Sequence, residues 1–526
     1  MLGRGVGDAE FLAEHGAELI ITDLKNEVEL APSLKRLNKF SNITYHLEGH
    51  HLEDFRNRPK SSGDDRGPDF ILKSAGVPLD SPFIAKARKN KIPIEMDASL
   101  FAKLAPKGVT IIGVTGTRGK STTTALIFEI LSLYVKGQRS IVKGFQSVFM
   151  AGNVRGVATL PLLKEVKKGD FVVLELDSWQ LQGFGEAKIS PRVAVFTNFL
   201  DDHLNYYKGD QERYFNDKAN IFRFQKKGLN RHAFGSAIGR DDILVVGKQA
   251  LKLVLGSHPL GQDDLIIARA TDVPKNWKIK LLGEHNRANI ACALAVARAL
   301  GVPDNISHRV VEKFKGVPGR LELIRTIRWV KIYNDNNATT PDATLAALRA
   351  LSLNSSFSKG GGESSSRRIL EDKSLTASGP LPLEKGESTD IVLIMGGTDK
   401  GLDMSKLMEE IPKYCKAVVF LKESGTEKLI SNFSFFNSSL RKGVSESERT
   451  GDVLFFKKAT LKECVEQAME IGQKGDIVLF SPAFASFGKW FKNEYDRGEQ
   501  FVEIVKKLKN LSRKKTGTIH ARFVEG

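Results

Sequence analysis

Short apolar runs alternate with longer amphipathic stretches through most of the chain. Five of these runs consist mainly of β-branched and other apolar residues, at 109–114, 171–176, 193–197, 391–395 and 476–480. Continuous apolar runs of this length are typical of strands that are buried on both faces of a parallel sheet. The stretches between them have helical patterns, so we expect an α/β protein in which helices connect parallel strands.

The same pattern divides the chain into three predicted domains. Residues 1–106, 107–317 and 318–526 form an N-terminal, a central and a C-terminal block, and a Pro-Gly hinge opens the third. A chain of 526 residues is too long for one ordinary core, which supports several domains. Residues 354–389 are rich in Ser and Gly and lack apolar periodicity, so we expect a disordered insertion within a Rossmann-like C-terminal block.

The N-terminal block is predicted to be a Rossmann-like domain whose first strand is missing. A glycine-rich segment at 3–7 precedes a short helical stretch and a strand at 18–22, which ends at Asp23. This order is typical of a dinucleotide-type fold, with a glycine turn and then an acidic residue at a strand end. No strand precedes the glycines, so either the start codon is misassigned or this unit has lost that strand. A later strand ends in a small-residue turn that begins at Ser74.

The central block contains a glycine-rich loop with the sequence GVTGTRGKSTTT at 113–124, between a predicted strand and a predicted helix. This arrangement directs backbone N–H groups and a helix N-terminus toward phosphate. Lys120 can then reach the β- and γ-phosphates of a nucleotide, and the Ser121 hydroxyl can ligate Mg²⁺. Val114 stands where the standard phosphate loop has its first glycine, so the loop is a variant. We predict a central domain of the P-loop ATPase type with a parallel sheet.

Acidic and polar residues follow two other strands of the central block. Glu175 lies at the end of one strand, where a carboxylate is costly to bury unless it is paired or ligates a cation. Asp201, Asp202 and His203 follow the next strand. The sequence leaves two interpretations open for these three residues: ligands of a metal ion, or a helix cap beside a surface histidine.

The charge and composition restrict the class of protein. The net charge is +17, but the lysines and arginines are spread along the chain, often beside acidic residues. We interpret this charge as a solvated surface with some bias toward anionic small substrates, and we expect no nucleic-acid partner. A non-catalytic protein that binds RNA or DNA is the rival class. Three widely spaced cysteines, no apolar run that could span a bilayer and no signal peptide predict a cytoplasmic protein.

Taken in order, the polar motifs resemble the Mur ligase family over nearly the full chain. The motifs are TGTxGKS at 115–121, LELxSxQL at 174–181, TNxxxDH at 197–203, Lys218 within 214–220, GEHNRAN at 283–289, GVPGR at 316–320 and YNDNNAT at 333–339. The family accepts a residue other than glycine at the position of Val114. The segments SWQL at 178–181 and SPAFASF at 481–487 are similar to the D-glutamate-adding branch of the family.

This resemblance implies an ATP-dependent amide ligase with three α/β domains. The implied reaction adds D-glutamate to UDP-N-acetylmuramoyl-L-alanine through an acyl phosphate, in the peptidoglycan synthesis that supports cell shape and division. It implies two Mg²⁺ ions and an N6-carboxylated Lys218, because an ammonium cannot ligate a metal. We expect a monomer. The alternatives are another Mur-type ligase that adds a different amino acid, or a ligase similar to folylpolyglutamate synthase.

The resemblance also implies roles for individual residues. Those implied in catalysis are Lys120, His203 and Lys218. Those implied in holding the nucleotide are Thr115, Gly116, Thr117, Gly119, Lys120, Ser121, Thr122, Asn286, Asn289, Arg320 and Asp335. The implied metal ligands are Ser121, Glu175, His203 and Lys218. Substrate contacts are implied for Asp23, Ser74, Asn153, Thr339, Lys400, Ser486 and Tyr495.

Three residues depart from the family's pattern. Arg118 replaces the usual asparagine of the phosphate loop and adds positive charge beside the phosphates. Asn337 stands where the D-glutamate-adding enzymes commonly have a lysine, which removes one cation from the amino-acid site. Arg155 interrupts the usual Gly-Asn-x-Gly segment. The sequence assigns no role to Arg118.

Overall fold

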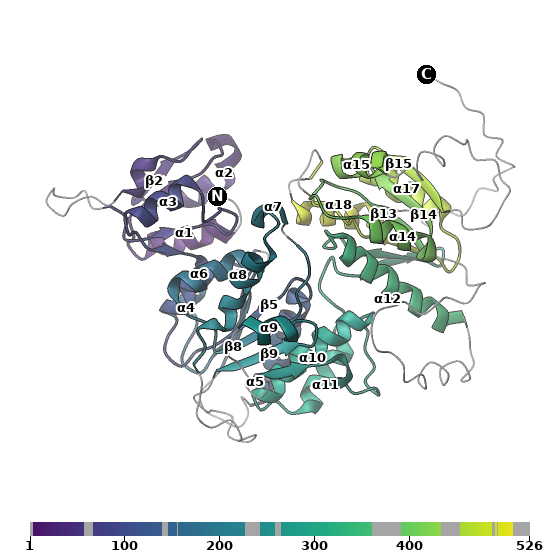
Figure 1. The fold of residues 1–526 in the computed structure, drawn as a ribbon, viewed down its shortest axis with the longest axis horizontal. Coiled ribbons are helices and arrows are strands. Elements are labelled where there is room, and N and C mark those ends of the chain that lie inside the picture. The colour runs from purple at the N-terminus through teal and green to yellow at the C-terminus, as the bar shows by residue number, and fades with distance from the viewer. Residues whose placement is uncertain are drawn as a thin grey trace. The chain divides into compact units, whose positions relative to one another are not determined.

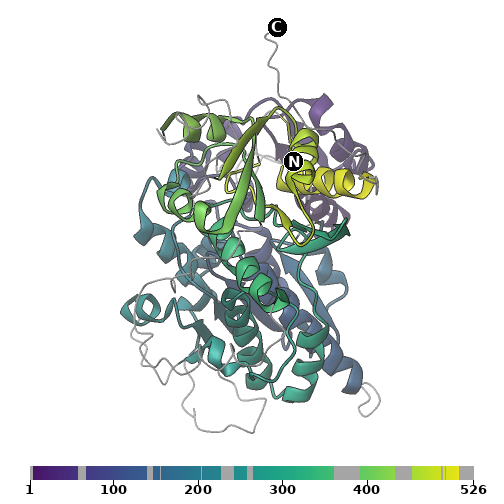
Figure 2. The same ribbon diagram turned by 90° about the vertical axis from the view of Figure 1, so that its right-hand side faces the viewer.

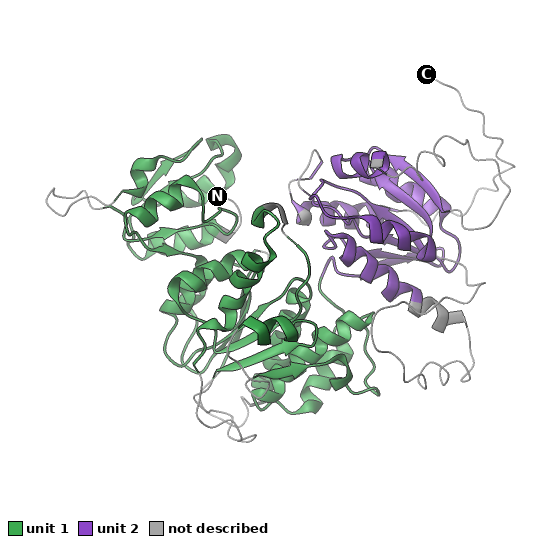
Figure 3. Ribbon diagram, in the orientation of Figure 1, with its two compact units in different colours: residues 1–317 green, residues 318–526 purple. Residues whose placement is uncertain are grey.

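The protein consists of two compact units, residues 1–317 and 318–526 (Figures 1 and 3). The computed structural model describes residues 4–56, 67–138, 146–154, 156–202, 204–226, 242–257, 265–359, 391–432, 453–486, 490–491 and 493–508. The division between the units falls at the start of the predicted C-terminal block. The boundary predicted at 106 lies inside the first unit and stays a prediction.

The N-terminal block contains two separate pairs of parallel strands, β1-β2 and β3-β4. Its strands are β1 (Leu19–Thr22), β2 (Ile43–His46), β3 (Ile71–Leu72) and β4 (Ile94–Glu95). Its helices are α1 (Arg4–Glu14), α2 (Glu27–Leu37), the 3-10 helix η1 (Leu52–Phe55), α3 (Pro82–Lys89) and α4 (Asp97–Leu104). The strand expected before the glycines would precede residue 4, the first described residue.

The glycine turn predicted at 3–7 is wrong for its described residues, because α1 already begins at Arg4. Gly7 lies within this helix, where a Cβ atom would come within 2.6 Å of the Cβ of Ala158. The glycine therefore permits close packing of the helix against its neighbour, rather than forming a turn.

The central block is built on a six-stranded parallel sheet with the strand order β10-β9-β8-β5-β7-β6. The strands are β5 (Thr110–Thr115), β6 (Val148–Gly152), β7 (Phe171–Glu175), β8 (Val193–Phe196), β9 (Ile243–Gly247) and β10 (Ile266–Ala268). The helices are α5 (Lys120–Gln138), η2 (Leu160–Lys164), α6 (Ser178–Ala187), α7 (Leu204–Tyr207), α8 (Gln211–Arg223), α9 (Leu251–Ser257), η4 (Ala270–Asp272), α10 (Glu284–Ala299) and α11 (Asp304–Lys313).

Both faces of the central sheet are covered by helices. On one face, Ile112, Val114 and Val195 belong to a core with Leu126 of α5 and Ile290 of α10. On the other face, alternate strand residues pack against α4, α6 and α8. Since successive side chains of a strand point to opposite faces, both sets of residues must be apolar, as the continuous runs predicted.

The second unit contains another six-stranded sheet, with the order β11-β12-β16-β13-β14-β15. The strands are β11 (Glu322–Ile327), β12 (Val330–Asn334), β13 (Ile391–Met395), β14 (Cys415–Leu421), β15 (Leu454–Lys458) and β16 (Ile477–Phe480). The helices are α12 (Pro341–Lys359), α14 (Ser405–Tyr414), α15 (Ser424–Asn432), α17 (Leu461–Ile471) and α18 (Glu494–Lys507). Only β11 is antiparallel among the described pairings, and helices lie on both faces of the sheet (Figure 2).

The three predicted α/β folds are confirmed, with one correction to the insertion. Helix α12 continues to Lys359, so residues 354–359 are helical and not part of a disordered segment. The remainder of the predicted insertion, 360–389, lies outside the described residues. Among the helices of the described ranges, none has the length and apolar character that crossing a membrane requires.

Candidate active site

The predicted phosphate loop and the predicted metal ligands Ser121 and Glu175 lie at one edge of the central sheet. Strand β5 lies between β7 and β8, and all three run parallel. The carboxyl ends of these strands therefore lie side by side. Lys120 begins the helix that follows β5, Glu175 ends β7, and Thr197 follows β8. This is the edge at which open α/β sheets bind their ligands.

Two glycines give the phosphate loop its shape. Gly116 and Gly119 have φ angles of +143° and +80°, which residues with a Cβ rarely adopt. A Cβ atom on Gly116 would overlap the hydroxyl of Thr197, and one on Gly119 would overlap the side-chain oxygen of Asn289. The loop is therefore pressed between the end of β8 and helix α10, which supplies Asn289.

Threonine hydroxyls fix this loop to the segments around it. Thr115 Oγ1 donates to the Leu176 carbonyl at 2.8 Å. Thr117 Oγ1 donates to the Leu200 carbonyl at 3.0 Å and accepts from the Leu200 N–H at 2.9 Å. Thr122 is buried as well. The sequence predicted that Thr115 and Thr117 bind the nucleotide. In the structure, their side chains hold the loop in place.

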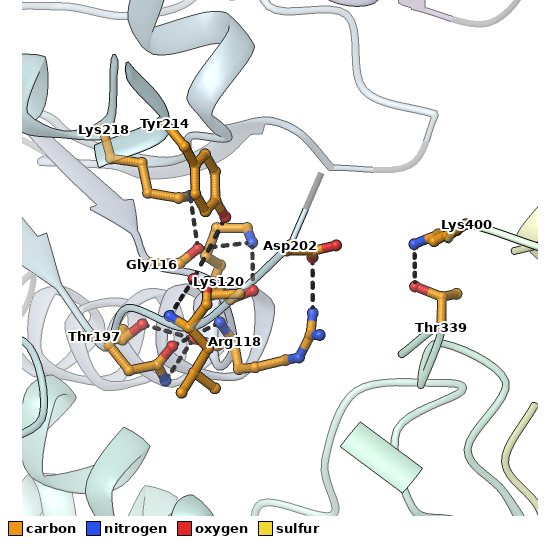
Figure 4. A network of polar contacts seen from close by, with 12 residues as sticks. Gly116, Arg118, Lys120, Thr197, Asp202, Tyr214, Lys218, Thr339 and Lys400 are labelled. Atoms are coloured by element: carbon orange, nitrogen blue, oxygen red, sulfur yellow. Dashed lines mark hydrogen bonds and ion pairs between the residues drawn. The ribbon is translucent and has the colours of Figure 1, made fainter. Parts of the chain in front are cut away.

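The amino groups of two lysines converge on one carbonyl of the loop (Figure 4). Lys120 Nζ donates to the Gly116 carbonyl at 3.0 Å and to the Thr117 carbonyl at 3.2 Å. Lys218 Nζ, from helix α8, donates to the same Gly116 carbonyl at 2.9 Å and lies 4.9 Å from the ring centroid of Tyr214. The structure therefore brings together the two lysines for which the sequence predicted catalytic roles.

The Lys218 side chain is almost completely buried, with 1% of its surface exposed. Burial lowers the pKa of its ammonium well below the usual range, and the positive charge of Lys120 lowers that pKa further. Both effects favour the neutral amine, which is a nucleophile.

Glu175 is buried next to Asn153, a predicted substrate contact. Gly152 pairs with Glu175 in the sheet, and the N–H of Asn153 donates to the Glu175 carbonyl at 2.7 Å. A Cβ atom on Gly152 would overlap that carbonyl, so the glycine permits this close approach. Ser121 lies in the first turn of α5 beside the same strand ends. His203, the fourth predicted metal ligand, lies outside the described residues.

Arg118 forms an ion pair that the sequence did not predict. Its guanidinium donates to Asp202 Oδ2 at 3.0 Å, and the two side chains are 23% and 7% exposed (Figure 4). The sequence interpretation offered Asp202 as a metal ligand or a helix cap and considered no partner on the loop. Arg118 and Asp202 are 84 positions apart, so no local sequence signal could have joined them.

The residues predicted to face the adenine and ribose lie in both units. In the first unit, Asn289 Nδ2 donates to Asn286 Oδ1 at 3.1 Å, which joins Asn286 to the residue that touches the phosphate loop. In the second unit, Asp335 accepts from the Leu321 N–H at 3.0 Å and from the Ser481 hydroxyl at 2.9 Å. Asp335 therefore fixes the backbone next to Arg320.

Predicted amino-acid contacts gather in the second unit. Lys400 Nζ donates to Thr339 Oγ1 at 3.0 Å (Figure 4). Ser486 is buried beside Ala485, whose backbone forms an isolated bridge with Thr398, two residues before Lys400. Tyr495 lies in the first turn of α18. The structure thus brings Thr339 and Lys400 into contact and places Ser486 on a segment paired with theirs.

A buried arginine that the sequence interpretation did not assign supports these segments. Arg497 is 0% exposed and donates to Asn336 Oδ1 at 2.7 Å and to the Asn336 carbonyl at 3.0 Å. It also donates to the carbonyls of Phe484 and Ala485 at 3.3 and 3.2 Å. One guanidinium thus connects the loop after β12 to the loop after β16. No local sequence signal joins Arg497 to Asn336, because the two residues are 161 positions apart.

Asn337, the residue that replaces a lysine, contacts the segment that opens the second unit. Its Nδ2 donates to the Pro318 carbonyl at 3.2 Å, and its N–H donates to the Gly319 carbonyl at 3.0 Å. Gly319 has a φ of +73°, and a Cβ atom there would lie 3.1 Å from Asn337 Nδ2. The asparagine therefore has a structural contact that the sequence did not reveal.

In the N-terminal block, the two predicted substrate contacts follow strands of different pairs. Asp23 follows β1, and its carboxylate accepts from the Lys25 N–H at 3.1 Å. Ser74 is exposed in the turn after β3. The buried Lys73 donates to the carbonyls of Ser74 and Val77 at 3.2 and 2.8 Å and so holds this turn. Burial lowers the pKa of Lys73 to about 8, although the charges of nearby carboxylates oppose this shift.

Comparison with known proteins shows the family of this chain. Residues 114–297 match the family model of the Mur ligase middle domain. The chain is 34% identical, over 96% of both sequences, to a UDP-N-acetylmuramoylalanine–D-glutamate ligase of Roseiflexus sp. (strain RS-1). It is 31% identical, again over 96% of both, to the protein of that name from Borreliella afzelii (strain PKo). The fold resembles that of UDP-N-acetylmuramate-alanine ligase from Thermotoga maritima, with a TM-score of 0.51, 19% identity and coverage of 96% and 97%. The chain belongs to the Mur ligase family.

Proposed function

We propose that this protein is an ATP-dependent ligase that joins D-glutamate to UDP-N-acetylmuramoyl-L-alanine. A carboxylate oxygen of the UDP-linked substrate attacks the γ-phosphorus of ATP, and ADP leaves. The amine of D-glutamate then attacks the acyl carbon, an amide bond forms, and phosphate leaves with the former carboxylate oxygen. The relatives that carry this activity in their names, at 34% and 31% identity over 96% of the chain, support the choice of substrates.

The phosphate loop fits a nucleotide. Its two glycines with positive φ allow the tight turn of the loop, and helix α5 begins directly after it. Backbone N–H groups and the helix N-terminus would hold the phosphates. Lys120 lies over the loop carbonyls and would turn its ammonium toward the β- and γ-phosphates. The cation then neutralises charge that develops during phosphoryl transfer.

Buried acidic and basic groups beside the loop fit a magnesium site. Ser121 and Glu175 would hold one ion, since hydroxyl and carboxylate oxygens are ligands that Mg²⁺ prefers. His203 and a carboxylated Lys218 would hold a second. When bound, the ions neutralise the repulsion between the phosphates and the substrate carboxylate. Carboxylation forms a bond between Lys218 Nζ and the carbon of CO₂ and releases a proton, which requires the neutral amine that burial favours.

The second unit supplies a site for the incoming amino acid. The ammonium of Lys400, next to the Thr339 hydroxyl, would pair with a carboxylate of D-glutamate. Ser486 and Tyr495 would complete the site, and Arg497 would keep its two loops in register. The uridine end of the other substrate would bind in the first unit near Asp23, Ser74 and Asn153.

The observation that carries the proposal is the convergence of Lys120 and Lys218 on the Gly116 carbonyl. A phosphate loop needs only the first lysine. A second, buried lysine at the same carbonyl is explained when its amine becomes an anionic ligand beside the phosphates. A lysine that only contributes to a solvated surface would not be buried against the Gly116 carbonyl.

A phosphate-release assay with the UDP-linked substrate tests the proposal. We expect ADP and phosphate only when both this substrate and D-glutamate are present. Lys218→Met should abolish release, whereas Lys208→Met, which changes an exposed lysine just before α8, should retain it. Turnover with another amino acid and none with D-glutamate would show a different ligase of the family. That result is the alternative suggested by Asn337 in place of a lysine.

We further propose that the enzyme acts in the cytoplasm as a monomer. Its three cysteines are buried free thiols, which agrees with a reducing compartment. Size-exclusion chromatography with light scattering should give the mass of one chain, 58.1 kDa.

A further inference from the structure

Two histidines and an aspartate gather beside the strand ends of the N-terminal block. Strand β2 ends at His46, whose carbonyl accepts from the N–H of Asp23 at 3.1 Å. The chain then turns back, and the Gly49 N–H donates to the Asp23 carbonyl at 3.1 Å. This turn brings His51 and the following 3-10 helix η1, which contains Asp54, back toward the end of β2.

The potential ligand atoms of this cluster lie close together. One side-chain atom each from His46, His51 and Asp54 can be chosen so that all three lie within 4.8 Å of one another. His46 Nδ1 and Asp54 Oδ2 share a hydrogen bond of 2.7 Å, and the ring centroids of His46 and His51 are 4.9 Å apart. Only 12% of the Asp54 side chain and 28% of the His46 side chain are exposed.

Packing of the next residue fixes the position of the aspartate. Phe55 ends η1 and is buried with Ile84 and Ile94 in the apolar cluster of this block. Its carbonyl accepts a hydrogen bond of 2.6 Å from Asn90 Nδ2. The side chain and the backbone carbonyl of Phe55 therefore anchor helix η1. This anchor holds the Asp54 carboxylate beside the imidazole of His46.

We propose that His46, His51 and Asp54 form a binding site for a late first-row divalent metal ion, such as Zn²⁺ or Co²⁺. Two imidazole nitrogens and one carboxylate oxygen are the donor set that such ions prefer, whereas Mg²⁺ and Ca²⁺ prefer oxygen ligands alone. Three protein ligands would leave one position of a tetrahedral ion for water or another ligand. This site is separate from the residues at the phosphate loop.

Metal binding requires the three donor atoms to adjust their spacing, and His51 is the exposed one of the three ligands. Donors around a tetrahedral ion with bonds of about 2.0 Å lie about 3.3 Å apart. The hydrogen bond between His46 and Asp54 must widen slightly as the ion replaces its hydrogen. His51 is exposed, so its side chain can rotate toward the other two.

His50 provides a matched control within the same turn. Its Nδ1 lies 2.6 Å from the Thr22 hydroxyl, and the edge of its ring meets Phe83 at a centroid distance of 5.0 Å. Both of these contacts are with residues outside the proposed set of ligands. Its substitution removes an adjacent imidazole without removing a proposed ligand.

The test is titration of the full-length, metal-stripped protein with Co²⁺ in the presence of saturating Mg²⁺, which occupies the oxygen-rich sites. We expect the wild-type chain to bind one more equivalent of Co²⁺ than His51→Ala, detected by the visible absorption of the bound ion. Asp54→Asn should weaken this binding more than about tenfold, and His50→Ala should leave it intact. Zn²⁺ should raise the Tm of the wild-type protein and not that of His51→Ala.

Equal Co²⁺ stoichiometry in the wild-type protein and His51→Ala would overturn the proposal. An equal loss in His50→Ala and His51→Ala would also overturn it, because it would show unspecific binding by surface histidines. Circular dichroism of each metal-free variant confirms folding. Because His51 is exposed, its substitution tests the site without disturbing the core.

Discussion

Arg118 combines a fixed backbone with a side chain that reaches the segment after β8. Its N–H donates to Asn198 Oδ1 at 2.8 Å, and its carbonyl accepts from the Thr197 hydroxyl at 2.6 Å. From this anchored position, its guanidinium pairs with Asp202, which precedes the predicted metal ligand His203. Arg118 therefore joins the phosphate loop to the segment that should carry a metal ligand.

We expect Arg118→Asn and Asp202→Asn each to lower kcat/KM for ATP about tenfold, because each removes an ion pair between two poorly exposed groups. The double variant should lose little more than either single variant, with a coupling energy of about 1 kcal/mol. Steady-state kinetics of the three variants measures this. Arg298→Asn, which breaks an exposed ion pair with Asp304, should leave the kinetics unchanged. Additive losses in the double variant would contradict the coupling.

Lys73 is the second residue whose surroundings give it unusual properties. It is 5% exposed, and its ammonium is held by backbone carbonyls of the turn after β3. Because its pKa is lowered to about 8 in the folded protein, the unfolded chain binds this proton more tightly. Stability must then rise with pH between the folded and unfolded pKa values, and the cost of the buried ammonium is fully present below pH 8.

Between pH 7 and pH 9, the free energy of unfolding of the wild-type protein should therefore rise by about 1 kcal/mol relative to Lys73→Met. Urea unfolding of both proteins at the two pH values measures this difference, and contributions from other groups cancel. Lys89→Met, a change of the same size at an exposed lysine of α3, is the control. A wild-type protein whose stability changes with pH in parallel with Lys73→Met would contradict the lowered pKa.

At the scale of elements, the phosphate loop contains a glycine that no other residue can replace without strain, whereas helix α5 contains a glycine with space for a side chain. Gly119 has a φ of +80°, and the side-chain oxygen of Asn289 occupies the place of its Cβ. Gly137 lies in the last turn of α5, where a Cβ atom would meet nothing within 4 Å. The first glycine is required by the loop, whereas the second lowers the stability of an exposed helical turn.

Gly119→Ala should reduce ATP binding more than about 100-fold, since a Cβ atom would displace the loop or Asn289 and strain the backbone. Gly137→Ala should retain ATP binding and raise the free energy of unfolding by about 0.5 kcal/mol. Isothermal titration with a non-hydrolysable ATP analogue and denaturant unfolding measure the two effects. Undiminished ATP binding in Gly119→Ala would show that the loop does not hold the phosphates.

Elements were predictable from sequence where the signal was local. Strand β13 agrees with its apolar run, and Glu175 was expected at the end of a buried strand because a carboxylate there interrupts an apolar pattern. The glycines at 3–7 misled the prediction, because glycine serves close helix packing as well as turns. The contacts of Arg118 with Asp202 and of Arg497 with Asn336 could not be predicted, because they join residues 84 and 161 positions apart.

At the scale of the whole molecule, each unit has a separate core. Leu294 of α10 belongs to the core of the central sheet, and Leu393 of β13 lies in the centre of the second sheet; both are 0% exposed. The predicted contacts of the UDP-linked substrate, Asp23, Ser74 and Asn153, all lie in the first unit. Units with separate cores can unfold separately, so a ligand of one unit need not stabilise the other.

Calorimetry of the full-length protein should therefore show two unfolding transitions. Leu294→Ala should destabilise only the transition of the first unit, and Leu393→Ala only that of the second, each by about 2–5 kcal/mol because a cavity replaces buried contacts. UDP-N-acetylmuramoyl-L-alanine at about 100 times its Kd should stabilise by about 2.7 kcal/mol only the transition that Leu294→Ala identifies. A single transition that both variants lower would show that the units unfold together. Stabilisation of the transition identified by Leu393→Ala would place contacts of this substrate in the second unit.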